Sequence, residues 1–222
     1  MDPTDVPEVV VSRLPMYVRA LSQLQLDGNR VVSSQDLGAR LQMTPAQIRK
    51  DLSYFGRFGK QGRGYNVGSL ATQLRMILGL DRDWRTCLVG VGRLGRAIIS
   101  YPGFAPQGFK IVAVFDGDPA QIGASIGNLK VRGMADLADA VQSQGIVIGI
   151  VAVPAEQAQS VIDQLVDAGV FGILNYAPTA PRIPEDVVMR NIDPVLSLQS
   201  MTYYLRKEQE RRGLTPQRLR IC

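Results

Sequence analysis

The chain has no histidine and only two cysteines among its 222 residues. Without an imidazole, Ser-His-Asp and Cys-His nucleophile systems, histidine metal ligands and histidine proton shuttles are excluded. Cys87 and Cys222 lie far apart in the sequence. They predict neither a disulfide framework nor a cysteine-based metal site, so we expect a protein that holds no metal.

Long hydrophobic runs are also missing. The longest, residues 145–154, has about half of the ~20 apolar residues that a membrane-spanning helix needs. The first ten residues are acidic where a signal peptide carries basic residues. We therefore expect a cytoplasmic protein that does not contact the membrane.

Charge is unevenly distributed along the chain. Hydrophobic residues make up 45% and charged residues 20%, which is enough apolar material for a folded core. Residues 40–75 contain seven Lys or Arg and one acid, Asp51, whereas residues 81–200 contain nine basic and twelve acidic residues. The length favours two modest domains, and the change of sign near residue 80 indicates their boundary.

The first domain is predicted to contain three helices. Leu14, Tyr17 and Leu21 recur at helical spacing and predict a helix over roughly 13–26. A short second helix carries Leu37 and Leu41 and begins at Ser33 or Ser34. The third runs from about 45 to 54, since Thr44-Pro45 is a capping residue followed by a proline in the first turn.

A glycine-rich basic segment follows the third helix. Residues 56–65 contain four glycines and three cations, which predicts a hairpin with a basic tip between short strands. Three helices and such a hairpin make a winged helix-turn-helix, whose third helix enters the major groove of DNA. The candidate DNA contacts are Ser34, Thr44, Gln47, Arg49, Lys50, Ser53, Tyr54, Arg57, Phe58, Gly59, Lys60 and Arg63.

A plainer interpretation of the same block is a solvated basic face on a small helical domain. The Thr-Pro cap, the close helix spacing and the glycine-cation loop together favour DNA binding. Tyr17, Leu52 and Phe55 are interpreted as core residues, and so is Phe58 despite its place in the basic segment.

The second half alternates apolar runs with amphipathic helices, which predicts an α/β fold with a parallel sheet. Strands are expected at 86–89, 109–115, 146–153 and 172–175, and helices at 93–100 and 156–168. Cys87 falls in a buried strand, so redox sensing through this thiol is not expected.

The first turn of this domain carries the residues Gly90, Val91, Gly92, Arg93, Leu94 and Gly95, a GxGxxG between a strand and a helix. In dinucleotide-binding folds these glycines allow the tight turn, the approach of the pyrophosphate and close helix packing. Asp116 ends the next strand, where a carboxylate accepts hydrogen bonds from the adenosine ribose. No arginine adjoins it, so NAD(H) is favoured over NADP(H); a glycine turn that binds nothing is the alternative.

Tyr101 follows the helix after the glycine turn and is a candidate to approach the nicotinamide; a helix-end aromatic that packs under a loop is the alternative. An NAD-dependent oxidoreductase with a helical N-terminal domain is a rival function. It needs a proton-transfer group beside the nicotinamide, and no lysine lies at a predicted strand end. A regulator that binds coenzyme A through the same turn is a third possibility.

The chain resembles the Rex family of redox-sensing transcriptional repressors over nearly its whole length. The resemblance rests on Arg49-Lys50-Asp51-Leu52-Ser53-Tyr54-Phe55-Gly56, on Gly62-Arg63-Gly64-Tyr65, on the glycine turn, on Tyr101-Pro102-Gly103-Phe104, and on Gly172-Ile173-Leu174-Asn175-Tyr176-Ala177-Pro178. The first of these strings is highly specific, since generic winged helices do not require it.

This resemblance implies a homodimer that binds an inverted-repeat operator in double-stranded DNA and is released by NADH, whereas NAD+ permits binding. It implies a winged-helix domain at 1–80, a Rossmann-type doubly wound NAD(H)-binding domain at 84–194, a domain-swapped dimerisation helix at 195–212, and a basic tail at 213–222 that we expect to be disordered. Val153, Pro154, Asn175, Ala177, Pro178 and Asp193 join the glycine turn, Tyr101 and Asp116 as cofactor-binding candidates.

One position departs from the family pattern. Rex proteins commonly place an aromatic residue after Asn-x-Asp, where it reaches the partner's nicotinamide pocket, but this chain has Asn191-Ile192-Asp193-Pro194. Pro194 cannot stack as an aromatic ring does, and we expect it to begin the C-terminal helix instead. Leu196, Leu198 and Met201 form an apolar stripe on that helix, which fits a swapped helix as well as one docked on its own chain.

Overall fold

The computed structural model describes residues 6–59 and 63–214. The chain folds as two compact units, Met1–Asp83 and Trp84–Cys222. Lys60, and the part of the predicted basic tail from residue 215 onwards, lie outside the described residues. Within the described ranges, no helix has the length and apolar character required to cross a membrane.

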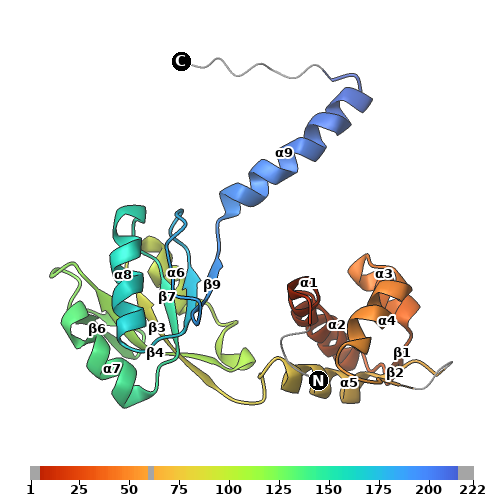
Figure 1. Ribbon diagram of the computed structural model, residues 1–222, viewed down its shortest axis with the longest axis horizontal. Helices are drawn as coiled ribbons and strands as arrows, with labels where there is room; N and C mark the ends of the chain where they lie inside the picture. The colour runs from red at the N-terminus through yellow and green to blue at the C-terminus, as the bar shows by residue number, and fades with distance from the viewer. Residues whose placement is uncertain (1–5, 60–62, 215–222) are drawn as a thin grey trace. The chain divides into compact units, whose positions relative to one another are not determined.

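The first unit consists of helices with one small two-stranded sheet (Figure 1). The three predicted helices are present, with ends within about two residues of the expected ones, and α1 and α5 are additional. The elements are α1 (Glu8–Val11), α2 (Leu14–Leu26), β1 (Val31–Val32), α3 (Ser34–Leu41), α4 (Pro45–Ser53), β2 (Tyr65–Asn66) and α5 (Val67–Ile77).

Two side-chain caps and one tight turn set the geometry of α3 and α4. The Ser33 hydroxyl accepts a hydrogen bond from the Asp36 amide, and the Thr44 hydroxyl accepts one from the Gln47 amide, so each begins its helix as a capping residue. Between them the chain passes so close to Gly38 that a Cβ there would lie 2.5 Å from the Met43 carbonyl oxygen. Only glycine fits this turn, which brings the start of α4 against α3.

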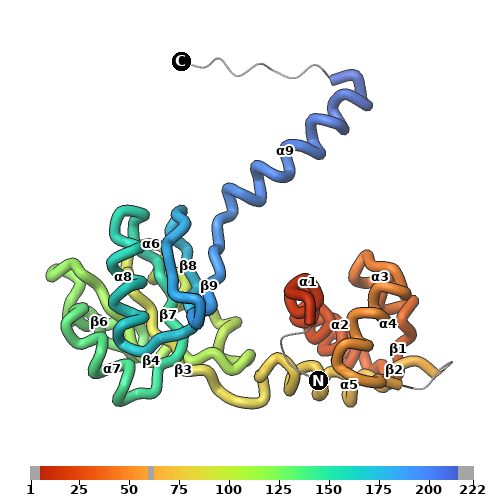
Figure 2. The backbone as a smooth tube through the Cα atoms, viewed as in Figure 1, coloured from red at the N-terminus to blue at the C-terminus, as the bar shows by residue number. Residues whose placement is uncertain are grey.

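The core of this unit is made of side chains from α2, α3, α4 and α5, and Figure 2 traces the path of the backbone through these helices. Ile48 and Leu52 of α4 are fully or almost fully buried against Tyr17 of α2, and Phe55 and Phe58 pack on the same cluster. The interpretation of these residues as core is confirmed. Their burial holds one side of α4 inside the unit and leaves the opposite side in solvent.

The hairpin predicted within residues 56–65 is seen only in part, because its expected tip, residues 60–62, lies outside the described residues. β2 pairs antiparallel with β1, which precedes α3, and residues 56–59 form no strand. The chain does fold back, because a Cβ on Gly59 would lie 2.6 Å from the Gly64 carbonyl oxygen. Gly59 and Gly64 both have positive φ, which glycine adopts without steric strain.

The second unit is a doubly wound α/β domain. Its elements are β3 (Trp84–Val89), α6 (Arg93–Ser100), η2 (Ala105–Gln107), β4 (Phe109–Asp116), β5 (Ser125–Ile126), β6 (Leu129–Gly133), η3 (Met134–Asp136), α7 (Leu137–Gln144), β7 (Ile148–Val151), α8 (Ala155–Asp167), β8 (Gly172–Asn175), β9 (Val188–Asn191) and α9 (Pro194–Arg211). The predicted strand over 146–153 is shortened at both ends, because the chain enters it from a left-handed Gly145 and turns into α8 at Pro154.

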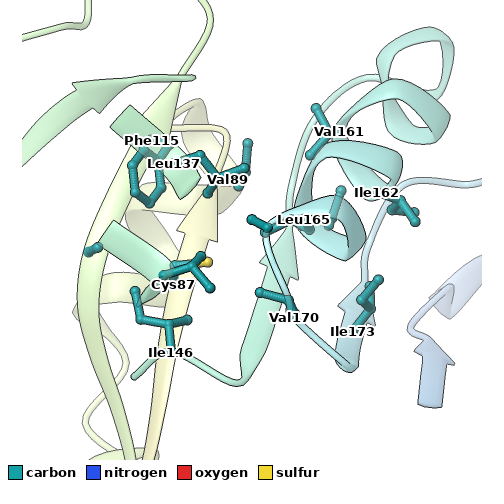
Figure 3. Close-up of a cluster of buried hydrophobic side chains, with 14 of the residues drawn as sticks. Cys87, Val89, Phe115, Leu137, Ile146, Val161, Ile162, Leu165, Val170 and Ile173 are labelled. Carbon is teal, nitrogen blue, oxygen red and sulfur yellow. The ribbon is translucent and has the colours of Figure 1, made fainter. Parts of the chain in front are cut away.

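The sheet has the strand order β5-β6-β4-β3-β7-β8-β9, and all its pairs are parallel except β5 with β6. From β6 to β9 this is the Rossmann order, which places β3 and β7 at the point where the winding direction reverses. Helices α7 and α8 bury one face, where Phe115, Ile146 and Ile162 belong to a single apolar cluster (Figure 3). α6 covers part of the other face through Ile98.

Cys87 of β3 lies in the apolar cluster beneath α7 and α8. The cysteine is fully buried, as are Ile162 and Leu165 of α8 in the same cluster. Burial raises the pKa of the Cys87 thiol to about 12, so the thiol stays protonated and unreactive at neutral pH.

The last helix, α9, differs from the others because none of its residues is buried. It begins at Pro194, as expected, and the Asp193 side chain caps it by accepting a 2.8 Å hydrogen bond from the Val195 amide. Its apolar stripe is open to solvent, with Leu196, Leu198 and Tyr204 58–70% exposed. The stripe is therefore not part of this unit's own core.

Candidate functional site

The outward side of α4 is polar and cationic. Arg49, Lys50 and Ser53 are exposed, whereas Ile48, Asp51 and Leu52 on the opposite side are buried. Arg49 donates a 2.9 Å hydrogen bond to the Ser34 hydroxyl, which joins two of the predicted DNA contacts at the start of α3 and the middle of α4. Two cations on the free face of a capped helix are suited to phosphate and base contacts.

A buried carboxylate ties α4 to α2. Asp51 is fully buried and accepts two hydrogen bonds from Arg13, each 2.7 Å long. It accepts two more, from the Tyr17 hydroxyl and from the Gln47 side-chain amide at 2.6 Å. Both carboxylate oxygens are therefore fully used, and no part of this group is left for an external ligand.

The protonation states of this cluster follow from its contacts. Burial by itself raises the pKa of Asp51, but hydrogen bonds from Arg13, Tyr17 and Gln47 outweigh it and lower the pKa below the usual range. Burial and the hydrogen bond to Asp51 raise the pKa of Tyr17. At neutral pH the carboxylate is charged and the tyrosine hydroxyl is a donor.

The glycine turn of the second unit has the geometry that its spacing predicts. Gly90 has φ +98°, and a Cβ on it would lie 2.5 Å from the Ala152 carbonyl oxygen. A Cβ on Gly95 would lie 1.9 Å from the Gly90 carbonyl oxygen, so only glycine lets α6 approach the strand this closely. Gly92, in contrast, faces open space at the start of α6, where unpaired backbone N–H groups favour an anion.

Asp116 contacts this turn directly. One of its carboxylate oxygens accepts a 2.6 Å hydrogen bond from the Val91 amide, and the other accepts one from the Asp118 amide at 2.9 Å. Asp116 therefore caps its own loop through the Asp118 amide as well as supporting the glycine turn. Each oxygen keeps a further lone pair, so the carboxylate can still accept from ribose hydroxyls.

The loops after β7 and β8 lie at the same carboxyl edge of the sheet. The Val153 side chain packs against Gly90, since a Cβ on Gly90 would lie 2.9 Å from Val153 Cγ1. Asn175 is fully buried, and its amide donates to the Ala177 carbonyl and to the Asn191 side chain, while its oxygen accepts from the Ala177 amide. Asn175 therefore shapes the loop that carries Ala177 and Pro178 instead of presenting its own amide.

An apolar groove of about 440 Å³ opens on the sheet face that carries α6. Tyr101 is 56% exposed there, and its ring meets Phe104 edge to face with 5.3 Å between centroids. The Thr86 hydroxyl at the groove is buried and has no hydrogen-bond partner among the described residues. The lining consists of Thr86, Tyr101, Gly103, Phe104, Gln107, Phe109, Ile148, Ile150, Gly172, Ile173, Leu174 and Arg190.

Two family models match the chain. One is described as "CoA binding domain" and matches residues 81–179; the other is described as "Putative DNA-binding protein N-terminus" and matches residues 5–53. A redox-sensing transcriptional repressor Rex from Chloroflexus aurantiacus is 53% identical over 95% of this chain and 100% of its own length. One from Streptomyces coelicolor is 41% identical over 94% of this chain and 80% of its own. This chain belongs to the Rex family.

Solved Rex-family structures are similar over nearly the whole chain. The repressor RSP in complex with beta-NAD+ and operator DNA has a TM-score of 0.88 at 37% identity, and the match covers 94% of this chain and 96% of RSP. RSP in complex with beta-NADH has a TM-score of 0.85 at 35% identity, with 95% and 99% covered. The relatives carry the name of repressors, not of enzymes, so the oxidoreductase interpretation is set aside.

The structure places the predicted DNA contacts in the first unit and the predicted cofactor-binding residues in the second. Within the second unit, the glycine turn, Asp116 and the loops after β7 and β8 share one edge of the sheet, whereas Tyr101 lines the groove and Asp193 caps α9. Sequence reasoning missed Arg13, Tyr17 and Asn191 as supporting residues. Arg13 and Tyr17 look like ordinary helix residues in the sequence. The one sequence signal that points to a cation partner is Asp51, the single acid in the basic residues 40–75.

Proposed function

We propose that this chain is a repressor that binds an inverted-repeat operator as a homodimer, senses the NADH/NAD+ ratio, and leaves DNA when it binds NADH. The observation that carries the proposal is that one chain joins the free cationic face of α4 to a glycine turn whose Gly92 is open to a ligand. Its relative RSP has been solved with operator DNA and NAD+, and with NADH.

In the first unit, α4 is the recognition helix. Arg49, Lys50 and Ser53 lie on its exposed side, and Arg57 and Arg63, which are also exposed, follow in the sequence between α4 and β2. The cations neutralise phosphates and meet base edges, while Asp51 holds the helix against α2. Thr44, Tyr54, Phe58 and Gly59 support the same surface from the two ends of the helix and from the loop.

In the second unit, the dinucleotide lies across the carboxyl edge of the sheet. Gly92 and the start of α6 receive the pyrophosphate, and Asp116 accepts from the adenosine ribose, which also disfavours a 2′-phosphate. Val153, Pro154, Ala177 and Pro178 border the nicotinamide half. The reduced ring of NADH lacks the positive charge of NAD+, so an apolar surrounding favours NADH.

Coupling requires two dimer states with different affinities for NADH. In the DNA-bound state the recognition helices are about 34–36 Å apart, one turn of the duplex. NADH shifts the population only by the difference in its affinity for the two states, and each ~1.4 kcal/mol of difference gives a tenfold shift. α9 supplies the dimer contact: its exposed apolar stripe swaps onto the partner, where the open groove offers an apolar surface.

The test is fluorescence anisotropy of a labelled palindromic A/T-rich duplex at fixed salt, with protein alone and with excess NAD+ or NADH. Specific binding that only NADH abolishes supports the proposal. DNA binding that neither cofactor changes would indicate a DNA-binding protein without redox sensing. Turnover of NADH with small carbonyl compounds would instead support the oxidoreductase interpretation.

A further inference from the structure

Gln47 occupies a place on α4 where it serves both the buried cluster and the surface. It is the third residue of the helix, one turn before Asp51. Its side-chain nitrogen Nε2 donates a 2.6 Å hydrogen bond to Asp51 Oδ1. The N-terminal residues of a recognition helix are the ones that contact base edges.

The other end of the same amide faces solvent. Gln47 is half-buried, and its Oε1 makes no hydrogen bond within the described residues. In those residues the only buried side-chain nitrogen or oxygen without a partner is Thr86 Oγ1. Gln47 Oε1 is therefore accessible, and it is an acceptor on the rim of the recognition helix.

The direction of this amide is fixed by its partner. Asp51 is an acceptor at both oxygens and already receives Arg13 and Tyr17. If the amide were turned around, Gln47 Oε1 would oppose a carboxylate oxygen, and an attractive contact would become a repulsive one in a buried setting. Thus Nε2 stays on Asp51 and Oε1 stays outside.

The fixed direction of the Gln47 amide affects base recognition, because a glutamine side chain without an intramolecular partner reads adenine with both ends of its amide. Its oxygen accepts from the adenine N6 amino group while its nitrogen donates to N7. We propose that Asp51 sets the hydrogen-bonding direction of Gln47, so that its Oε1 is held outward and accepts from an exocyclic amino group of the operator, adenine N6 or cytosine N4. The inference rests on the proposed DNA-binding function and adds a specificity-determining residue to it.

The experiment uses base analogues in the half-site that the full chain selects from a random duplex library. At each adenine, the base is replaced by purine, which lacks the amino group; at each cytosine, the N4 amino group is removed. We expect one position at which loss of the amino group weakens binding about twofold to tenfold, the size of one ordinary hydrogen bond.

The Gln47→Met variant keeps the length of the side chain without its polar atoms, and it should lose the dependence on that amino group. Gln25→Met, an exposed glutamine on α2, is the matched control and should keep it. Thermal unfolding of each variant shows that it is folded at the assay temperature. If no base position shows an amino-group dependence that Gln47→Met removes, the inference is overturned. A chain that selects no duplex at all would instead refute the proposed function.

Discussion

The Asp116 carboxylate accepts a 2.6 Å hydrogen bond from the backbone amide of Val91, the residue between the first two glycines of the turn. The proposed ribose acceptor of β4 thereby also holds the loop that is proposed to receive the pyrophosphate. The two parts of the proposed dinucleotide site are fixed to each other before any ligand binds. This reduces the entropy lost on binding, because the turn is already in place.

Asp116→Ala should weaken the response to NADH, so that higher NADH concentrations are needed, while operator affinity stays within about twofold of the unchanged protein. The substitution removes both the ribose acceptor and the support for the turn, and losing a charged hydrogen-bond partner costs about 1.5–3 kcal/mol, or roughly tenfold to a hundredfold in affinity. Titration of NADH by calorimetry and of DNA by anisotropy measures the two effects.

Asp118→Ala is the control for that change. Asp118 is exposed, and its side chain accepts a hydrogen bond from the Ala120 amide, while its backbone amide still reaches Asp116. NADH affinity should change little. An equal loss in both variants would assign the effect to general negative charge in this loop instead of to Asp116.

Gly92 and Gly95 should respond differently to alanine. A Cβ on Gly92 meets open space in the free protein, so Gly92→Ala should fold normally and bind NADH at least tenfold more weakly because the methyl group occupies the anion position. A Cβ on Gly95 would lie 1.9 Å from the Gly90 carbonyl oxygen, so Gly95→Ala should destabilise the second unit by about 1–3 kcal/mol. Denaturant unfolding separates the two; equal stabilities would contradict this geometry.

Lys50→Ala should weaken DNA binding and reduce its dependence on salt. Lys50 is exposed on the outward side of α4, and each phosphate contact contributes about 0.9 to the slope of log K against log salt. A series of anisotropy titrations at several salt concentrations gives the slope. Lys130→Ala in the second unit is the matched loss of an exposed charge, and its slope should stay unchanged.

Much of the architecture is predictable from local signals. Thr44-Pro45 locates the start of α4, and the glycine spacing locates the turn after β3. The pairing of β2 with β1 is not predictable this way, because it joins Val31–Val32 to Tyr65–Asn66 across two helices, and nothing local in residues 56–65 indicates that distant partner.

The supporting contacts of the site are harder to predict than the site itself. Gln47 and Asn175 are polar residues at the expected places, yet Gln47 is held by Asp51 one helical turn away, and Asn175 is held by Asn191 on a different strand. Sequence spacing shows that Gln47 and Asp51 share a helix face, but it does not show that Arg13 pairs with the buried carboxylate. Such networks depend on tertiary packing.

The first unit should lose stability in acid through Asp51. The pKa of Asp51 is lower in the folded chain than its ordinary value of 3.8, so folding favours the charged carboxylate. This contribution is complete above about pH 4 and is lost as the pH falls through the folded pKa. Hydrogen exchange of the α2 and α4 amides in the full chain measures it, with the α8 amides as internal reference.

Asp51→Asn should lower the stability of α2 and α4 at neutral pH by about 3 kcal/mol, because it leaves the Arg13 charge without its partner. The same substitution should remove the acid dependence, since the amide that replaces the carboxylate does not titrate. Hydrogen exchange of the variant, followed from neutral pH into acid, measures both effects. A variant that kept the acid loss would place its origin in another carboxyl group.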